Sequence, residues 1–149
     1  MIKIETLIQL PKTEDFVPFS EEMFHQLDTS QFRLEYLQGA ISIIYWGEEL
    51  LGHMYTDDII SLWAYIINGL EDYLNKGKTE IYSSGTVLTM TRLPQKQLLF
   101  AVNNKKFTLP ETDFLELLLA EAIRFFGILG QVREAAEAKK LIGCLDQLS

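Results

Sequence analysis

The spacing of apolar residues changes along the chain and predicts both helices and strands. Over residues 56–76 the apolar side chains recur every three or four positions, which places them within about 160° of arc at roughly 100° per residue. These side chains are Ile59, Leu62, Trp63, Ile66, Ile67, Leu70, Tyr73 and Leu74. Thr56 is a favourable N-cap, and Gly77 can take the left-handed conformation that ends a helix. We therefore expect a long amphipathic helix whose apolar face lies on a sheet.

Segments with alternating or β-branched residues predict the strands. Residues 2–10 alternate apolar and polar side chains, as a half-buried strand does. Two strands are expected over residues 32–37 and 40–46, joined by a turn at Gln38-Gly39. The second of these is apolar on both faces, which is typical of a central strand. Further strands are expected over residues 79–83, 86–93, 98–102 and, more briefly, 105–108.

Three more helices are expected beside the long one. A short helix is predicted over residues 21–27, with acidic residues in its first turn. Residues 108–111 match a capping box, and a strongly apolar helix follows until Gly127 and Gly130 break it. A final amphipathic helix is expected over residues 131–148.

These elements predict an α+β fold in a single domain that spans residues 1–149. The turns between successive strands are short, which favours antiparallel pairing of neighbours. We expect a mainly antiparallel sheet of about six strands, with the long amphipathic helix and the two C-terminal helices packed on it.

The composition is that of an ordinary globular domain, with 48% hydrophobic and 23% charged residues. No apolar run approaches the roughly 18 residues of a membrane-spanning helix. The first residues lack the basic and apolar regions of a signal peptide, and Cys144 is the only cysteine, so no intrachain disulfide can form. We therefore expect a cytoplasmic protein without a membrane partner, a metal or another cofactor.

The distribution of charge restricts the possible classes of partner more than the composition does. The net charge is −8 at pH 7, and it is uneven: residues 1–75 carry −10 and the remainder carries +2. An acidic half repels nucleic acid and anionic membranes and attracts a basic partner. The other interpretation, which the sequence leaves open, is that the acidity serves only solubility.

Few residue patterns suggest catalysis. His53 precedes Asp57 and Asp58 by four and five positions, and an imidazole with two carboxylates could hold a metal ion. Both aspartates, however, are also expected near the start of the long helix, where they complement its dipole. Glu48 and Glu49 could act as an acid–base pair, yet neighbouring side chains on an extended chain point to opposite sides, which favours a solvated turn. We expect no catalytic residue, and a metal-dependent or small-ligand enzyme using His53, Asp57 and Asp58 is the alternative.

An exposed aromatic residue beside acidic residues is typical of a recognition surface. Tyr65 falls on the polar side of the long helix, which also carries acidic residues near its end. We expect a surface that binds a basic protein, and its residues are Glu48, Glu49, Asp57, Asp58, Tyr65, Glu71 and Asp72. The oligomeric state stays open, and a dimer through residues 40–46 or the last helix is one alternative.

The order of elements also resembles a known group of proteins. Residues 34–44, Leu-Glu-Tyr-Leu-Gln-Gly-Ala-Ile-Ser-Ile-Ile, are followed by the amphipathic segment 57–76, a β-meander and the apolar segment 114–126. In this pattern, and in size and charge, the chain resembles the small acidic α+β immunity proteins of bacterial polymorphic and contact-dependent toxin systems. The resemblance covers most of the chain and carries over no individual site residue. It implies stoichiometric binding that blocks the active site of a toxin, without catalysis, and a basic nuclease would be a natural target.

Overall fold

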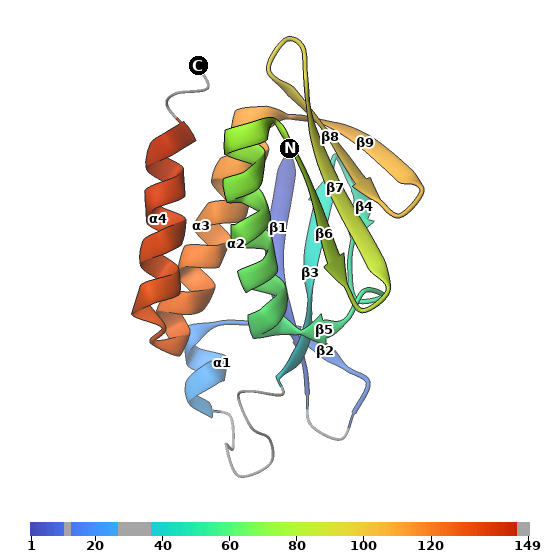
Figure 1. Cartoon of the computed structure of the whole chain (residues 1–149). Helices are drawn as coiled ribbons and strands as arrows, with labels where there is room; N and C mark the ends of the chain where they lie inside the picture. Colours follow the sequence, from blue (N-terminus) through green and yellow to red (C-terminus); the bar gives the residue numbers. More distant parts are fainter. Residues whose placement is uncertain (11–12, 27–36, 146–149) are drawn as a thin grey trace.

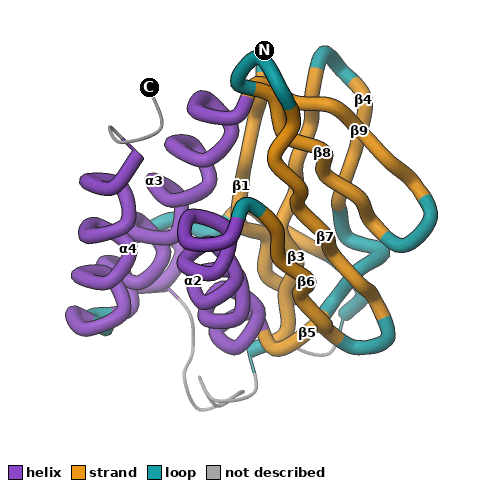
Figure 2. Tube along the Cα trace, turned by 45° about the horizontal axis from the view of Figure 1, so that its top comes forward, coloured by secondary structure: helices purple, strands orange, loops and turns teal. Residues whose placement is uncertain are grey.

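Helices and strands lie on opposite sides of the molecule in the computed structural model, which describes residues 1–10, 13–26 and 37–145 (Figure 1). Three helices, α2 (Ile59–Lys76), α3 (Glu111–Leu129) and α4 (Val132–Leu145), pack against one another along the strands (Figure 2). The strands form two antiparallel sheets. The predicted α+β fold and antiparallel pairing are confirmed, although the strands are divided between two sheets instead of forming one.

The first sheet is built around strand β3 (Gln38–Tyr45). Its strand order is β2 (Phe16–Pro18), β1 (Ile2–Gln9), β3 and β4 (Glu48–Leu51), and the short β5 (Asp57–Asp58) also pairs with β3. The residues from Ala40 to Ile43 are buried, which confirms the central strand that the apolar pattern predicts. β1 is half-buried, as its alternation predicts.

The second sheet is a meander of four strands in chain order: β6 (Lys78–Ser83), β7 (Thr86–Leu93), β8 (Gln97–Val102) and β9 (Lys105–Pro110). One face carries buried apolar side chains. The opposite face carries mainly polar ones together with Leu99 and Ala101, as expected where only one side of a sheet meets a core. The buried side chains include Ile81, Leu88, Met90, Leu98 and Phe100. These strands closely match the expected segments.

The helices join the two sheets through a shared core. Among the strands, α2 packs chiefly against β6 and α3 chiefly against β1. α4 packs on α3 and α2 and forms the outermost layer of helices (Figure 1). The predicted apolar face of α2 is confirmed, because all of its residues except the half-buried Leu74 are buried. No helix in the described part of the chain is long and apolar enough to cross a membrane.

The expected turn at Gln38-Gly39 is wrong, because both residues belong to β3. A Cβ atom at Gly39 would lie 2.3 Å from the carbonyl oxygen of Leu7. The glycine is therefore needed for a close approach between β1 and β3, not for a tight turn. The expected strand over residues 32–37 lies almost entirely outside the described residues.

Two predicted helix starts are also wrong. α2 begins at Ile59, and its N-cap is Asp58 instead of Thr56. One carboxylate oxygen of Asp58 accepts the backbone N–H of Ile60 at 3.1 Å. The capping box at 108–111 does not form, because this segment belongs to β9 up to Pro110, and Pro110 at the N-cap of α3 makes no side-chain hydrogen bond.

The ends of the other helices agree better with expectation. α1 (Glu21–Gln26) is capped by Ser20, whose hydroxyl accepts the backbone N–H of Met23 at 3.1 Å. α3 continues through Gly127, where a break was expected, and ends at Gly130. α2 ends at Gly77 with φ +78°, as predicted.

Candidate partner-binding surface

Glu48 and Glu49 lie on β4, at the edge of the first sheet. Both are exposed, but they are not in the turn in which the sequence placed them. The turn consists of Trp46 and Gly47, and Glu48 pairs with Tyr45 across the hairpin. The two carboxylates therefore belong to neighbouring positions of a strand, where side chains alternate between faces.

Asp57 and Asp58 are half-buried, and their carboxylates serve the fold. One oxygen of Asp57 accepts the backbone N–H of Asp58 at 2.7 Å, and the other accepts the hydroxyl of Ser83. Asp58 caps α2 through the backbone N–H groups of the first turn. These hydrogen bonds fix the start of α2 against β6, which leaves the two aspartates less free for a partner.

His53 is exposed, and its ring lies 5.9 Å from that of Phe16. Within residues 1–10, 13–26 and 37–145, no three side chains of the His, Cys, Asp or Glu types come together in a way that could hold a metal ion. Among these described residues, His53, Asp57 and Asp58 therefore do not form the three-ligand group that the sequence offered as an alternative.

Tyr65, Glu71 and Asp72 lie on the outer side of α2. The side chain of Tyr65 is 45% exposed, which agrees with its expected position on the polar face. Asp72 follows the helix start at Asp58 by fourteen residues, or about 20 Å along the axis at ~1.5 Å per residue. The seven residues that the sequence grouped into one surface are therefore spread over β4, β5 and the length of α2.

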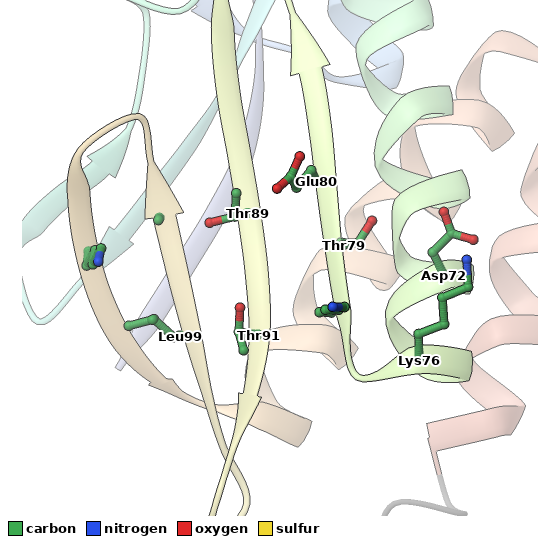
Figure 3. Close-up of a pocket in the computed structure, with 10 residues that line it drawn as sticks. Asp72, Lys76, Thr79, Glu80, Thr89, Thr91 and Leu99 are labelled. Carbon is green, nitrogen blue, oxygen red and sulfur yellow. The ribbon is translucent and has the colours of Figure 1, made fainter.

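Asp72 borders a hollow of about 530 Å³ on the outer face of the second sheet. Figure 3 shows Glu80 on β6 and Thr89 on β7 next to each other in this hollow, with Asp72 and Lys76 on α2 at its side. Its charged lining residues are Asp72, Glu80, Lys76, Lys78 and Lys106. Lysines outnumber acids in this hollow, so it is not suited to a basic partner.

A buried carboxylate connects α3, β1 and α2 in the core. Glu121 of α3 is only 8% exposed, and its Oε2 atom accepts the backbone N–H of Thr6 at 2.9 Å and the Thr6 hydroxyl at 2.7 Å. The indole N–H of Trp63 donates to the same hydroxyl at 3.1 Å. Arg124 donates from Nε to Oε1 of Glu121 at 2.7 Å and from its guanidinium to the carbonyl of Phe19. This network holds α2 and α3 to β1.

A second buried carboxylate lies at the start of α3. Glu111 is 3% exposed and accepts the hydroxyl of Tyr73 and, at 3.0 Å, the Nε–H of Arg92. The guanidinium carbon of Arg92 lies 5.2 Å from the centre of the Tyr73 ring. Burial, followed by the hydrogen bond to Glu111, raises the pKa of Tyr73 well above its usual range. Both carboxylates are buried, and hydrogen-bond donors of this chain satisfy them, which is the arrangement of a structural network.

An apolar groove with an acidic rim lies where the turn between β3 and β4 meets α3. It has a volume of about 480 Å³. Its lining residues are Met1, Ile2, Tyr45, Trp46, Pro110, Asp113, Glu116 and Leu117. Sequence reasoning missed this groove, because its residues come from three distant parts of the chain. The available signal was a tryptophan directly before the glycine of a tight turn.

No family model matches this chain, and comparison with curated proteins and with solved structures finds no match either.

Proposed function

We propose that this protein is a non-catalytic binding protein for a basic protein, and that its partner is a toxin domain from a bacterial polymorphic or contact-dependent toxin system. In this role it resembles the immunity proteins of those systems, which bind a toxin stoichiometrically and block its active site. The proposal combines the resemblance with the charge of the folded surface.

The observation that carries the proposal is a set of exposed carboxylates that form no ion pair with another described residue. Among the described residues, the ion pairs use Glu5, Glu21, Glu111, Glu121 and Glu137. None of them includes Glu48, Glu49, Glu71, Asp72, Asp113 or Glu116, all of which are exposed. With a net charge of −8, these unpaired carboxylates create a negative potential that accelerates encounters with a basic protein.

A non-catalytic role agrees with the position of the group with the large pKa shift, Tyr73. Strongly shifted pKa values in an open cleft often indicate an active site. Here the raised pKa of Tyr73 belongs to a hydroxyl that donates to a carboxylate with only 3% exposure. The geometry therefore favours a structural role for this group over an acid–base role.

Binding to purified toxin domains tests the proposal. Basic toxin nuclease domains, first of all one encoded beside the gene for this chain, should bind with one-to-one stoichiometry in calorimetry and lose their nuclease activity. The association rate should fall at least about tenfold between about 0.1 M and about 1 M salt, because the Debye length shrinks from ~10 Å to ~3 Å. Acidic toxin domains of similar size serve as the control. Binding that ignores salt, or no binding to any basic domain, would reject the proposal.

A further inference from the structure

Trp46 occupies a position that is unfavourable for a tryptophan within the isolated chain. Its φ is +50° and that of Gly47 is +81°, as in the two-residue hairpin turns that favour Asn-Gly. A bulky residue with positive φ is a genuine conformational outlier. The side chain is also 76% exposed, so burial within the chain does not offset the strain. A tryptophan kept in this state is best explained by contact with something outside the chain.

The turn is held in place rather than free. The backbone N–H of Trp46 donates to the carbonyl of Met1 at 2.9 Å, and the ring of Tyr45 lies edge-on to the indole at 6.3 Å between centroids. Leu117, 42% exposed on α3, forms the facing apolar wall. The indole therefore stands at the side of a preformed groove.

The rim of the groove is acidic. Asp113 and Glu116 are one helical turn apart on α3, so their side chains lie on one side of the helix. Glu48 adds a third exposed carboxylate beside Tyr45. In the described part of the chain, no lysine or arginine pairs with any of these three. The groove thus combines apolar walls and an exposed indole with three carboxylates, which outnumber the one positive group at its lining, the α-ammonium of Met1.

We propose that this groove binds a segment of the basic partner in which a lysine or arginine lies next to an apolar side chain. The apolar side chain packs between Leu117 and Trp46, and the cation lies on the indole face within reach of Asp113 and Glu116. Tryptophan is the best aromatic partner for a cation, and carboxylates add charge complementarity. The assignment rests on the proposed function, because it places the basic partner on the chain. A second copy of this chain does not fit, because its own groove and net charge are negative.

Nuclear magnetic resonance can test the groove with a defined probe. A blocked Lys-Leu-Arg-Leu-Lys peptide should move the indole N–H signal of Trp46. The signal of Trp63 should stay in place, because that indole is fully buried and donates to Thr6. A Glu-Leu-Gln-Leu-Glu peptide is the control ligand. Any purification tag belongs at the C-terminus, because Met1 lines the groove.

Two double variants separate the groove from overall charge. Asp113→Asn with Glu116→Gln should weaken peptide binding at least ~10-fold, because both removed charges face the cation. Glu14→Gln with Asp15→Asn changes the net charge equally, yet it should leave the affinity within about twofold. Both residues are exposed and follow the far end of β1, about 20 Å or more from Met1 at ~3.3 Å per residue, where screening weakens their effect on the groove. Equal losses in both variants would overturn the groove while the binding of basic toxin domains still stands. A Trp46 signal that does not move when the peptide is added would also overturn it. The proposed function, in contrast, fails if no basic toxin domain binds or if the binding does not depend on salt.

Discussion

Four carboxylates on α3 place the same chemical group in two different environments. Glu111 and Glu121 are buried, and each is hydrogen-bonded to an arginine and to further donors. Asp113 and Glu116 are exposed at the rim of the groove, and neither forms an ion pair with another described residue. The helix therefore uses one side to fasten the fold and the other to present charge.

The difference follows from the cost of removing a charge from water. A buried carboxylate is tolerated only when several donors replace its hydration, so its partners must be built into the chain. An exposed carboxylate keeps its water, and its pairing contributes ~0–1 kcal/mol to stability at most. Exposed carboxylates can therefore be placed to suit a partner with little effect on folding. If so, removing a buried carboxylate should lower stability much more than removing an exposed one.

The largest effect is expected for Glu121→Ala. The substitution leaves the backbone N–H and hydroxyl of Thr6 without their acceptor and leaves Arg124 without its carboxylate. Arg124 is partly exposed and can regain water, so we expect a loss of about 3 kcal/mol in the free energy of unfolding. Urea denaturation followed by circular dichroism measures it. Glu121→Gln keeps an acceptor for Thr6, so its free energy of unfolding should fall less. A loss below about 1 kcal/mol for the alanine variant would contradict the difference between buried and exposed carboxylates.

Glu111→Ala should cost about 2 kcal/mol, because fewer donors depend on this carboxylate. The hydroxyl of Tyr73 and the Nε–H of Arg92 lose their shared acceptor. Arg92 is 38% exposed and can be rehydrated, whereas the Tyr73 side chain has 0% exposure. The same denaturation measurement applies. A loss as large as that of Glu121→Ala would mean that the two buried sites do not differ as their donor counts indicate.

Features that depend on local residue patterns could be predicted from the sequence. The apolar face of α2, the central strand β3 and the four strands of the second sheet follow from spacing alone, because burial imposes periods of 3.6 or two residues. The α+β fold follows in turn. The division into two sheets was not predicted, since no local pattern states which strands pair across the intervening helix α2.

The buried networks and the groove could not be predicted, because they join residues far apart in the chain. Glu121 and Thr6 are 115 positions apart, and Trp46 meets a helix that begins at Glu111. Asp57 and Asp58 were expected in the first turn of the long helix and on the partner-binding surface. They are instead used in β5, in the cap of α2 and in a bond to Ser83. A glutamate within a strongly apolar helix, such as Glu121, was the one local sign of a buried network.

Tyr73→Phe removes one of the two donors to Glu111. It should lower the free energy of unfolding by about 1 kcal/mol at neutral pH. Because burial and Glu111 raise the pKa of Tyr73, the folded chain keeps a proton that the unfolded chain releases near pH ~10. This contribution is complete below that pH and is lost as the pH rises toward the folded-state value. The free energy of unfolding of the native chain should therefore fall more steeply above pH ~10 than that of the phenylalanine variant. Parallel slopes would show that the Tyr73 pKa is not raised.

Trp46→Asn tests the groove side of the comparison. Asn-Gly is the preferred pair for a turn in which both residues have positive φ, so the variant should gain about 0.5–1 kcal/mol in stability. Binding of the basic peptide should nevertheless be lost, as followed by the backbone amide signals of Leu117 and its neighbours. A gain in stability together with a loss of binding is the usual sign of a strained functional residue. A destabilised variant would show instead that Trp46 serves the fold.

The smallest effect on stability is expected for Asp113→Asn combined with Glu116→Gln. Both side chains are exposed and have no cation among the described residues, so the free energy of unfolding should change by less than about 0.5 kcal/mol. Asp113 lies in the first turn of α3, where its negative charge interacts favourably with the positive end of the helix dipole. Any small change in the free energy of unfolding should therefore be a decrease. Thermal and urea unfolding of this double variant and of Glu121→Ala, measured side by side, compare the contributions of exposed and buried carboxylates to stability. If removing the two rim charges costs as much as removing one buried charge, the rim belongs to the fold and α3 has no side reserved for a partner.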